Sequence, residues 1–214
     1  MMSMLAIQDF HTVVRERHSV RHYDPSVKIS REEMEEILKD ATLAPSSSNL
    51  QPWRFLVIDD QALKEKLHPI ANNQQQVLDA SAVIAVLGDL RWYEQGEKIY
   101  NMSFESGFMT EEIKERFIQV ASNGYANMSD EVKNSIIDVD AGLASMQLML
   151  SAKARGYDTV PMGGYNKEQF VEEFNIPEHY RSVMLIAVGK AASPARPTVR
   201  LPLEDVISWN EMKS

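Results

Sequence analysis

Three arginines near the start of the chain have the types and spacing needed to bind a phosphate. Arg15, Arg17 and Arg21 lie within a stretch of seven residues, and His18 and Ser19 stand between them. A guanidinium group binds phosphate oxygens through two parallel hydrogen bonds, and a serine hydroxyl adds a directional donor. The alternative is a positively charged helix end that interacts favourably with the helix dipole. These residues alone favour the two interpretations about equally.

A polar loop at residues 45–52 is the second candidate. It has the sequence Pro-Ser-Ser-Ser-Asn-Leu-Gln-Pro, with hydroxyls and amides between two prolines. Pro45 and Pro52 keep this segment out of a helix and out of a sheet ladder, so its backbone must be irregular. Ordered loops of this kind often hold a ligand, but turn-forming residues that simply end a helix would look the same. Local chemistry leaves both interpretations open.

Two pairs of residues are weaker candidates. Gly163 and Gly164 follow a predicted strand and expose bare backbone where a flat ligand could lie, although an ordinary turn is the commoner reason for such a pair. Asn73 and Gln76 could present amides to the polar edge of a heterocycle. Helix capping or solvent exposure explains these amides equally well.

A second basic group lies in the C-terminal tail. Lys190, Arg196 and Arg200 follow one another with no acidic residue between them, in a proline-containing segment without periodicity. Such a tail is expected to run extended over a surface. It could close over the same anion as the first arginine cluster, or its charges could simply be solvated.

Composition excludes several classes of protein. The net charge of −9 disfavours binding to nucleic acid, and the absence of cysteine excludes disulfides, iron–sulfur clusters and cysteine zinc sites. The sequence contains no P-loop, no G-x-G-x-x-G and no G-x-S-x-G. His18 and His22 lie in a predicted loop, so no metal site is expected. No signal peptide or membrane span is recognisable, which predicts a cytoplasmic protein with no membrane partner.

Hydrophobic periodicity predicts helices and strands in one domain, residues 1–214. Amphipathic spacing predicts a helix over residues 7–15, and a capping box of Ser30 with Glu33 begins another that must end before Pro45. Glutamates crowd this second helix at positions 32, 33, 35 and 36, and most should form its solvated face. Short apolar runs predict buried strands at residues 55–58, 82–87, 157–162 and 183–188.

Two further segments shape the expected architecture. Residues 132–155 predict a long helix that is apolar on nearly every face from 141 to 154 and stops at Gly156. Such a helix must be central or shared with a partner subunit. Residues 90–128 are polar, helical in pattern and studded with aromatic side chains, which indicates an excursion from the main domain.

Five segments, taken in order, resemble the flavin-dependent nitroreductase family over nearly the whole chain. They are Arg-His-Ser-Val-Arg at 17–21, the loop 45–53, Asn-Gln-Gln-Gln at 73–76, Pro-Met-Gly-Gly at 161–164 and Arg-Leu-Pro-Leu at 200–203. Within the family, residues 83–90, 146–149, 152–158 and 164–170 are similar to the NAD(P)H nitroreductases of Bacillus-type bacteria. No single motif decides the matter, but the ordered set is specific.

The resemblance implies an α+β fold of three layers, in which helices flank a central mixed or antiparallel sheet. It also implies a homodimer that exchanges its extended C-terminal tails and binds two FMN molecules at the interface. Each FMN would be held by residues of both subunits.

The resemblance gives the candidate residues separate roles. Arg17, Ser19 and Arg21 would hold the phosphate or the nearby flavin edge, with His18 beside them and Arg200 closing from the tail. From the other subunit, Pro45, Ser46 and Ser48 would lie along the flavin, and Ser47 and Asn49 would support that loop. Asn73 and Gln76 would meet the pyrimidine edge of the ring. Beside the ring, with a backbone amide near N5, would pass Pro161, Met162, Gly163 and Gly164.

The implied activity is an FMN-dependent NAD(P)H oxidoreductase with ping-pong kinetics. NAD(P)H would deliver hydride to flavin N5 and leave, after which a nitroaromatic, a quinone or a similar electron-poor acceptor would take its place. The cofactor performs the chemistry, so no catalytic side chain is predicted. The excursion at 90–128 would lie over the cleft and influence acceptor choice. Dehalogenation, enone reduction, flavin destruction and a non-catalytic flavin-binding dimer remain alternatives.

Overall fold

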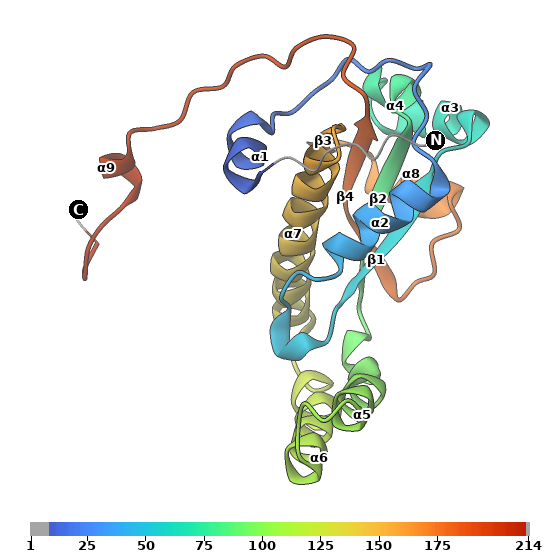
Figure 1. The fold of residues 1–214 in the computed structure, drawn as a ribbon. Coiled ribbons are helices and arrows are strands. Elements are labelled where there is room, and N and C mark those ends of the chain that lie inside the picture. The colour runs from blue at the N-terminus through green and yellow to red at the C-terminus, as the bar shows by residue number, and fades with distance from the viewer. Residues whose placement is uncertain (1–8, 213–214) are drawn as a thin grey trace.

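The computed structural model describes residues 9–212 of the 214-residue chain and has an α+β fold (Figure 1). Four strands form one sheet in the order β1-β2-β4-β3, and every neighbouring pair is antiparallel. The predicted strands are all present, with bounds shifted by up to three residues: β1 (Trp53–Ile58), β2 (Ala82–Asp89), β3 (Asp158–Met162) and β4 (Tyr180–Gly189). The sheet is therefore antiparallel, one of the two forms that the resemblance implied.

Helices cover both faces of the sheet and give it three layers. Side chains alternate along β2, so that Ile84 and Val86 face one cluster while Val83 and Ala85 face the other. The first cluster packs against α2 (Arg31–Ala41) and α7 (Asp130–Ala154). The second packs against α3 (Gln61–Ile70), α4 (Gln76–Asp79) and α8 (Lys167–Glu173). Because both faces are covered, all eight residues of β2 are buried.

Side-chain capping fixes the start of α2, where the sequence predicted it, and the start of α8. The hydroxyl of Ser30 accepts a hydrogen bond from the backbone N–H of Glu33 at the start of α2, and Asn166 caps α8 in the same way. The first predicted helix is α1 (Phe10–Glu16), and residues 7 and 8 of that prediction lie outside the described residues. Helix α3 was not predicted at all, and it contains Pro69.

Helix α7 is the long apolar helix of the prediction. It ends as expected before Gly156, whose φ of +82° suits glycine. Its other faces are not all buried: the side chains of Val139, Leu143 and Met146 are 61%, 43% and 38% exposed. A row of exposed apolar side chains on the central helix leaves a face that a second subunit could cover.

The excursion forms a helical unit at one end of α7, at the bottom of Figure 1. It contains η2 (Trp92–Gln95), α5 (Gly96–Glu105), α6 (Glu111–Gln119) and a π-helical turn, η3 (Val120–Tyr125). Trp92 and Tyr100 are buried in a small core together with Leu50 of the loop 45–52 and Ile137 of α7, and Phe117 and Tyr125 pack against this core. Several of its aromatic residues therefore stabilise the excursion itself, whereas Phe108 is exposed.

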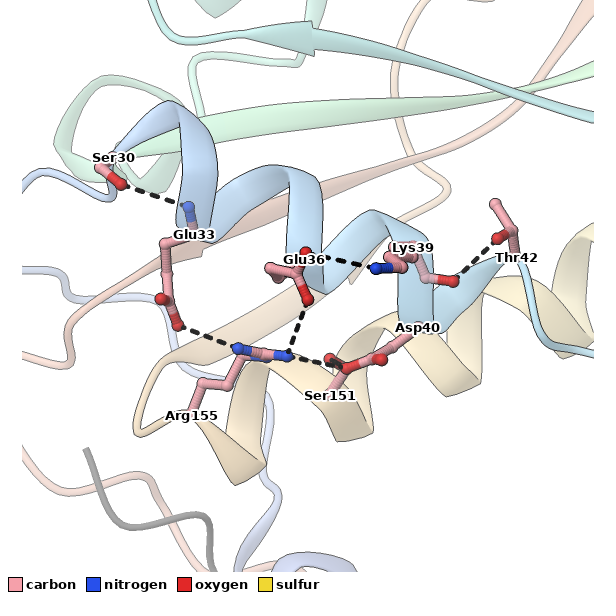
Figure 2. Close-up of polar contacts among 8 residues, drawn as sticks. All are labelled: Ser30, Glu33, Glu36, Lys39, Asp40, Thr42, Ser151 and Arg155. Atoms are coloured by element: carbon pink, nitrogen blue, oxygen red, sulfur yellow. Dashed lines mark hydrogen bonds and ion pairs between the residues drawn. The ribbon is translucent and has the colours of Figure 1, made fainter. Parts of the chain in front are cut away.

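An arginine at the end of α7 joins it to α2 (Figure 2). The guanidinium of Arg155 lies 3.2 Å from Asp40, 3.5 Å from Glu33 and 4.0 Å from Glu36, and Ser151 also donates to Asp40. Glu32, Glu35 and Glu36 are exposed, as predicted for most of the glutamates of α2, whereas Glu33 is half-buried. Glu33 and Glu36 also lie beside Arg155. They contact a residue more than 100 positions away, which periodicity cannot reveal.

The C-terminal tail leaves the body of the molecule as an extended segment, as predicted (Figure 1). It carries a short helix, α9 (Leu203–Val206), and exposed apolar side chains that include Leu201 and Trp209. Within residues 9–212, no helix combines the length and apolar composition needed to cross a membrane.

Candidate active site

The arginine segment lies beside the outer strand β3. Ser19 forms a parallel bridge with Thr159, and the backbone N–H of Val20 donates to the carbonyl of Thr159 at 3.1 Å. Val20 is buried in the core beneath, while Arg21 is exposed. One buried side chain thus anchors the segment, and its polar residues are held against the strand that leads into Gly163.

Three polar atoms of this region are buried without a hydrogen-bond partner in the described part of the chain. They are Nε of Arg17, Nδ1 of His18 and Oγ1 of Thr159. Buried polar groups are nearly always paired, and an unpaired one costs free energy. Only two other side-chain atoms between residues 9 and 212 share this condition, on His68 and Trp92. The concentration of unpaired atoms beside β3 is typical of a site that receives a ligand.

The amide segment lies next to the end of β3. The side-chain amide of Gln76, which is buried, donates to the sulfur of Met162 at 3.5 Å. Asn72 and Gln74 both donate to the carbonyl of Gly164, at 2.9 and 3.2 Å. The structure thus brings two of the predicted segments together. Exposed residues complete the group: Asn73, Pro161, Gly163 and Gly164.

A cavity of about 420 Å³ lies between the arginine segment and the start of the tail. Ser19, Arg21 and His22 line one side, and Arg196 lines the other. Lys190, which belongs to the same basic group in sequence, instead donates to the carbonyl of Gly156 at 3.0 Å. The tail therefore brings Arg196 to this cavity, whereas Lys190 binds the backbone beyond the end of α7.

Arg200 lies farther along the extended tail, where it is exposed. Its guanidinium donates to the Thr198 hydroxyl at 2.9 Å and to the Val199 carbonyl at 2.8 Å. Both acceptors are its immediate neighbours in sequence. The structure therefore does not bring Arg200 to the cavity beside Ser19, which Arg196 lines instead.

The loop 45–52 forms a second group at a different edge of the sheet. It leads directly into β1, whereas the arginine segment lies along β3, and these are the two outer strands. Ser48, Asn49 and Gln51 have φ angles of 51°, 56° and 50°, which are unusual for residues other than glycine. Strained backbone persists where surrounding contacts impose it, and it concentrates at functional sites.

Contacts from two helical elements hold this loop. Ser47 donates from its backbone N–H and its hydroxyl to the carboxylate of Asp140, at 3.0 and 3.3 Å. Tyr100 donates to the carbonyl of Ser48 at 2.8 Å, and the hydroxyl of Tyr125 lies 2.7 Å from that of Ser48. Burial raises the pKa of Asp140, and the hydrogen bonds from Ser47 partly oppose that shift. Burial likewise raises the pKa of Tyr100 to about 12.

Sequence reasoning missed the residues that hold the two groups in place. Thr159 and Asp140 sit in segments that were recognised only as an apolar strand and an apolar helix. The available signal was the place of Asp140 directly before the apolar stretch 141–154, because an acidic residue buried there needs a partner. Tyr100 and Tyr125 were noted only as aromatic members of the excursion.

Comparison with known proteins identifies the family. The model of the Nitroreductase family matches residues 14–190. "Putative NAD(P)H nitroreductase YdgI" of Bacillus subtilis is 48% identical over 208 residues, which cover 96% of this chain and all of the relative. The "CLA biosynthesis enone reductase" of Lactiplantibacillus plantarum is 34% identical and covers 92% of each chain.

A solved structure gives the same result. The crystal structure of a "putative nitroreductase in complex with FMN" from Exiguobacterium sibiricum superimposes with a TM-score of 0.92 at 47% identity. The match covers 97% of this chain and 100% of that one. The family model spans both groups of candidate residues up to position 190, and the relatives match almost the whole chain. The chain therefore belongs to the nitroreductase family.

Proposed function

We propose that this protein is an FMN-dependent NAD(P)H oxidoreductase that reduces nitroaromatic compounds, quinones or similar electron-poor acceptors. Bound FMN supplies the redox chemistry, since it can take a hydride from NAD(P)H and pass electrons to an acceptor. Donor and acceptor would use the same open space in turn, which gives ping-pong kinetics. The observation that carries the proposal is the group of buried, unpaired polar atoms beside β3 in a chain with FMN-binding relatives.

The residues beside β3 fit the chemistry of FMN. Arg17, Ser19 and Arg21 supply cationic and hydroxyl donors for a phosphate, and Arg17 and His18 each have a buried nitrogen without a partner within residues 9–212. Thr159, the β3 residue that pairs with Ser19, adds an unpaired hydroxyl. A phosphate or polar ring edge would satisfy these atoms, and Arg200 would join them from the tail.

The amide segment and the two glycines fit the flavin ring. Gln76 and Asn73 would present their side-chain amides to its pyrimidine edge, and the Gln76 amide nitrogen is already held in place by Gln74 and Met162. A Cβ added at Gly163 would meet no atom within 4 Å among the described residues, so bare backbone is open to a ligand there. A backbone N–H of this turn would lie near the atom that exchanges hydride.

A homodimer would complete each site. Loop 45–52 and the arginine segment lie along opposite outer strands, so we propose that the loop serves the FMN of the partner subunit. Pro45, Ser46 and Ser48 would lie along that ring, with Ser47 and Asn49 supporting the loop. Exposed apolar side chains offer surfaces for such an assembly: Phe10 and Val14 on α1, Val139, Leu143 and Met146 on α7, and Leu201, Leu203, Val206 and Trp209 in the tail.

Reduction of an enone is the second candidate activity. It keeps the same residues and the same cofactor and changes only the acceptor, and it is favoured by the 34% identity to an enone reductase over most of the chain. Analysis of products from matched nitroaromatic, quinone and enone acceptors would separate the two activities.

Purification and turnover test the proposal. The purified protein should be yellow or should take up FMN, and nitrofurazone or menadione should accelerate its oxidation of NADPH or NADH. In stopped-flow mixing, NADPH should bleach the flavin within seconds. Colourless protein that fails to bind FMN would overturn the proposal, and bound flavin that no reduced nicotinamide bleaches would favour a non-catalytic dimer.

A further inference from the structure

We propose that Asp140 is a positioning residue for the flavin site of the partner subunit. This inference rests on the proposed function, in which loop 45–52 lies along the partner's FMN. Asp140 touches neither the cofactor nor the acceptor in this account. It holds Ser47 and thereby fixes the conformation of the loop.

The surroundings of Asp140 show that the carboxylate serves the loop. Asp140 is 2% exposed and lies on α7 immediately before the segment 141–154. No ion pair involves it anywhere in residues 9–212, and its two hydrogen bonds both come from Ser47. A buried carboxylate is costly unless it is satisfied. The contacts with Ser47 therefore account for a carboxylate at this buried position.

The loop needs this support because its backbone is strained. Ser48, Asn49 and Gln51 all have left-handed φ angles, and a residue with a side chain adopts that region only when its surroundings impose it. Asp140 binds the residue just before this strained stretch. Without that contact, the loop is expected to relax into other conformations and to contact the cofactor less well.

The support reaches the loop from two sides. On the side of the excursion, Tyr100 and Tyr125 hold Ser48 through its carbonyl and its hydroxyl. On the side of α7, Asp140 holds Ser47. Helix α7 also carries the exposed row of Val139, Leu143 and Met146, so the same helix that would pack against a partner positions the loop offered to that partner.

Titration of apoprotein with FMN tests this role. We expect Asp140→Ala to raise the FMN dissociation constant about tenfold, because hydrogen bonds to a charged group are among the stronger ones. Asp140→Asn keeps an oxygen that can accept from the Ser47 backbone and an amide beside the Ser47 hydroxyl, so its affinity should stay within about threefold of wild type. Asp138→Ala, which removes a half-exposed carboxylate from the same helix, is the matched control and should not change FMN affinity.

Thermal melting of the same apoproteins separates positioning from a purely structural role. Asp140→Asn should melt no lower than wild type, because it removes a buried charge. An Asp140→Ala protein that folds but binds FMN as tightly as wild type would overturn the inference, as would an Asp140→Asn protein weakened as much as Asp140→Ala. Failure of wild-type apoprotein to bind FMN would instead overturn the proposed function.

Mixed dimers test the role across the interface. One subunit carries Asp140→Ala, the other carries Arg17→Ala, and two different affinity tags isolate the mixed species. If the loop acts on the partner's FMN, one site holds both defects and the other holds neither, so half of the sites should bind with wild-type affinity. If instead both sites are weakened, one by each substitution, and none binds with wild-type affinity, Asp140 acts within its own subunit and the inference is wrong.

Discussion

Two clusters of charged side chains in this protein differ in how completely their hydrogen bonds are satisfied. Around Arg155, one guanidinium faces three carboxylates and a serine completes the contact between α2 and α7 (Figure 2). Around Arg17, beside β3, buried nitrogens of Arg17 and His18 have no partner in the part of the chain that the structure describes. Both clusters lie between segments far apart in sequence.

We interpret this difference as the one between charges that serve the fold and charges that, in the proposed function, serve a ligand. A cluster whose donors and acceptors pair with one another stabilises the fold by itself, and a ligand would add few hydrogen bonds to it. A cluster that buries donors without partners is stable only if the rest of the fold holds it, and a ligand that supplies acceptors relieves the cost. The contrast predicts opposite phenotypes for arginine substitutions in the two clusters.

The largest effect is expected from Arg17→Ala. It should weaken FMN binding by about 10- to 100-fold, because a charged donor to the phosphate is lost, while the melting temperature of the apoprotein falls little. Fluorescence titration of apoprotein measures the affinity, and size-exclusion chromatography checks that the dimer persists. A variant that binds FMN as wild type does would remove the distinction between the clusters.

Arg155→Ala should show the opposite pattern. We expect it to destabilise the fold by about 1–2 kcal/mol, because three carboxylates are left facing one another, and to lower the melting temperature by about 3–6 °C. FMN affinity of the folded fraction should not change. Arg31→Ala removes an exposed pair with Glu35 and is the control, expected to melt within about 1 °C of wild type. Equal melting of Arg155→Ala and wild type would contradict the structural role of this cluster.

Arg200→Ala is expected to weaken FMN binding by about three- to tenfold. Its side chain is exposed and, within residues 9–212, is bonded only to its neighbours Thr198 and Val199, so the tail must settle in the proposed dimer before Arg200 can contact a phosphate. The dimer itself should be unaffected, which sedimentation would verify. If affinity is unchanged at low ionic strength, the phosphate assignment of Arg200 is wrong.

The smallest effect concerns stability and pH at Asp140. Burial raises the pKa of Asp140 in the folded protein, so its ionised form costs stability at any pH above that raised pKa. Asp140→Asn should therefore be more stable than wild type at pH 7, by about 1 kcal/mol or less. The difference should shrink as the pH falls through the folded pKa towards the ordinary range of an aspartate. Denaturant unfolding between pH 4 and pH 7 measures the difference in unfolding free energy between Asp140→Asn and wild type. A difference that grows as the pH falls would contradict the prediction.

Local chemistry predicted much of the fold. Ser30 with Glu33 begins α2 as the capping box indicates, Gly156 stops α7, and the four apolar runs are the four strands of the sheet. Each of these signals depends on residues within a few positions of one another. Helix α3 was missed because Pro69 lies inside its last turn, where proline usually argues against a helix.

The site was predicted as a list of segments but not as a geometry. The sequence could not show that Ser19 pairs with Thr159 or that Ser47 pairs with Asp140, because these residues lie about 90 or more positions apart. It also could not assign Glu33 and Glu36 to Arg155, for the same reason. Long-range pairing decides which polar residues are satisfied within the chain and which are left for a ligand.

A comparison of FMN with riboflavin, which lacks the phosphate, tests the central claim most directly. Dissociation constants for both ligands are measured on wild-type apoprotein and on Arg17→Ala. If the unpaired donors beside β3 serve the phosphate, wild type should prefer FMN strongly, and Arg17→Ala should lose at least about tenfold of that preference. The same preference for FMN in both proteins would contradict the assignment of this cluster to the phosphate.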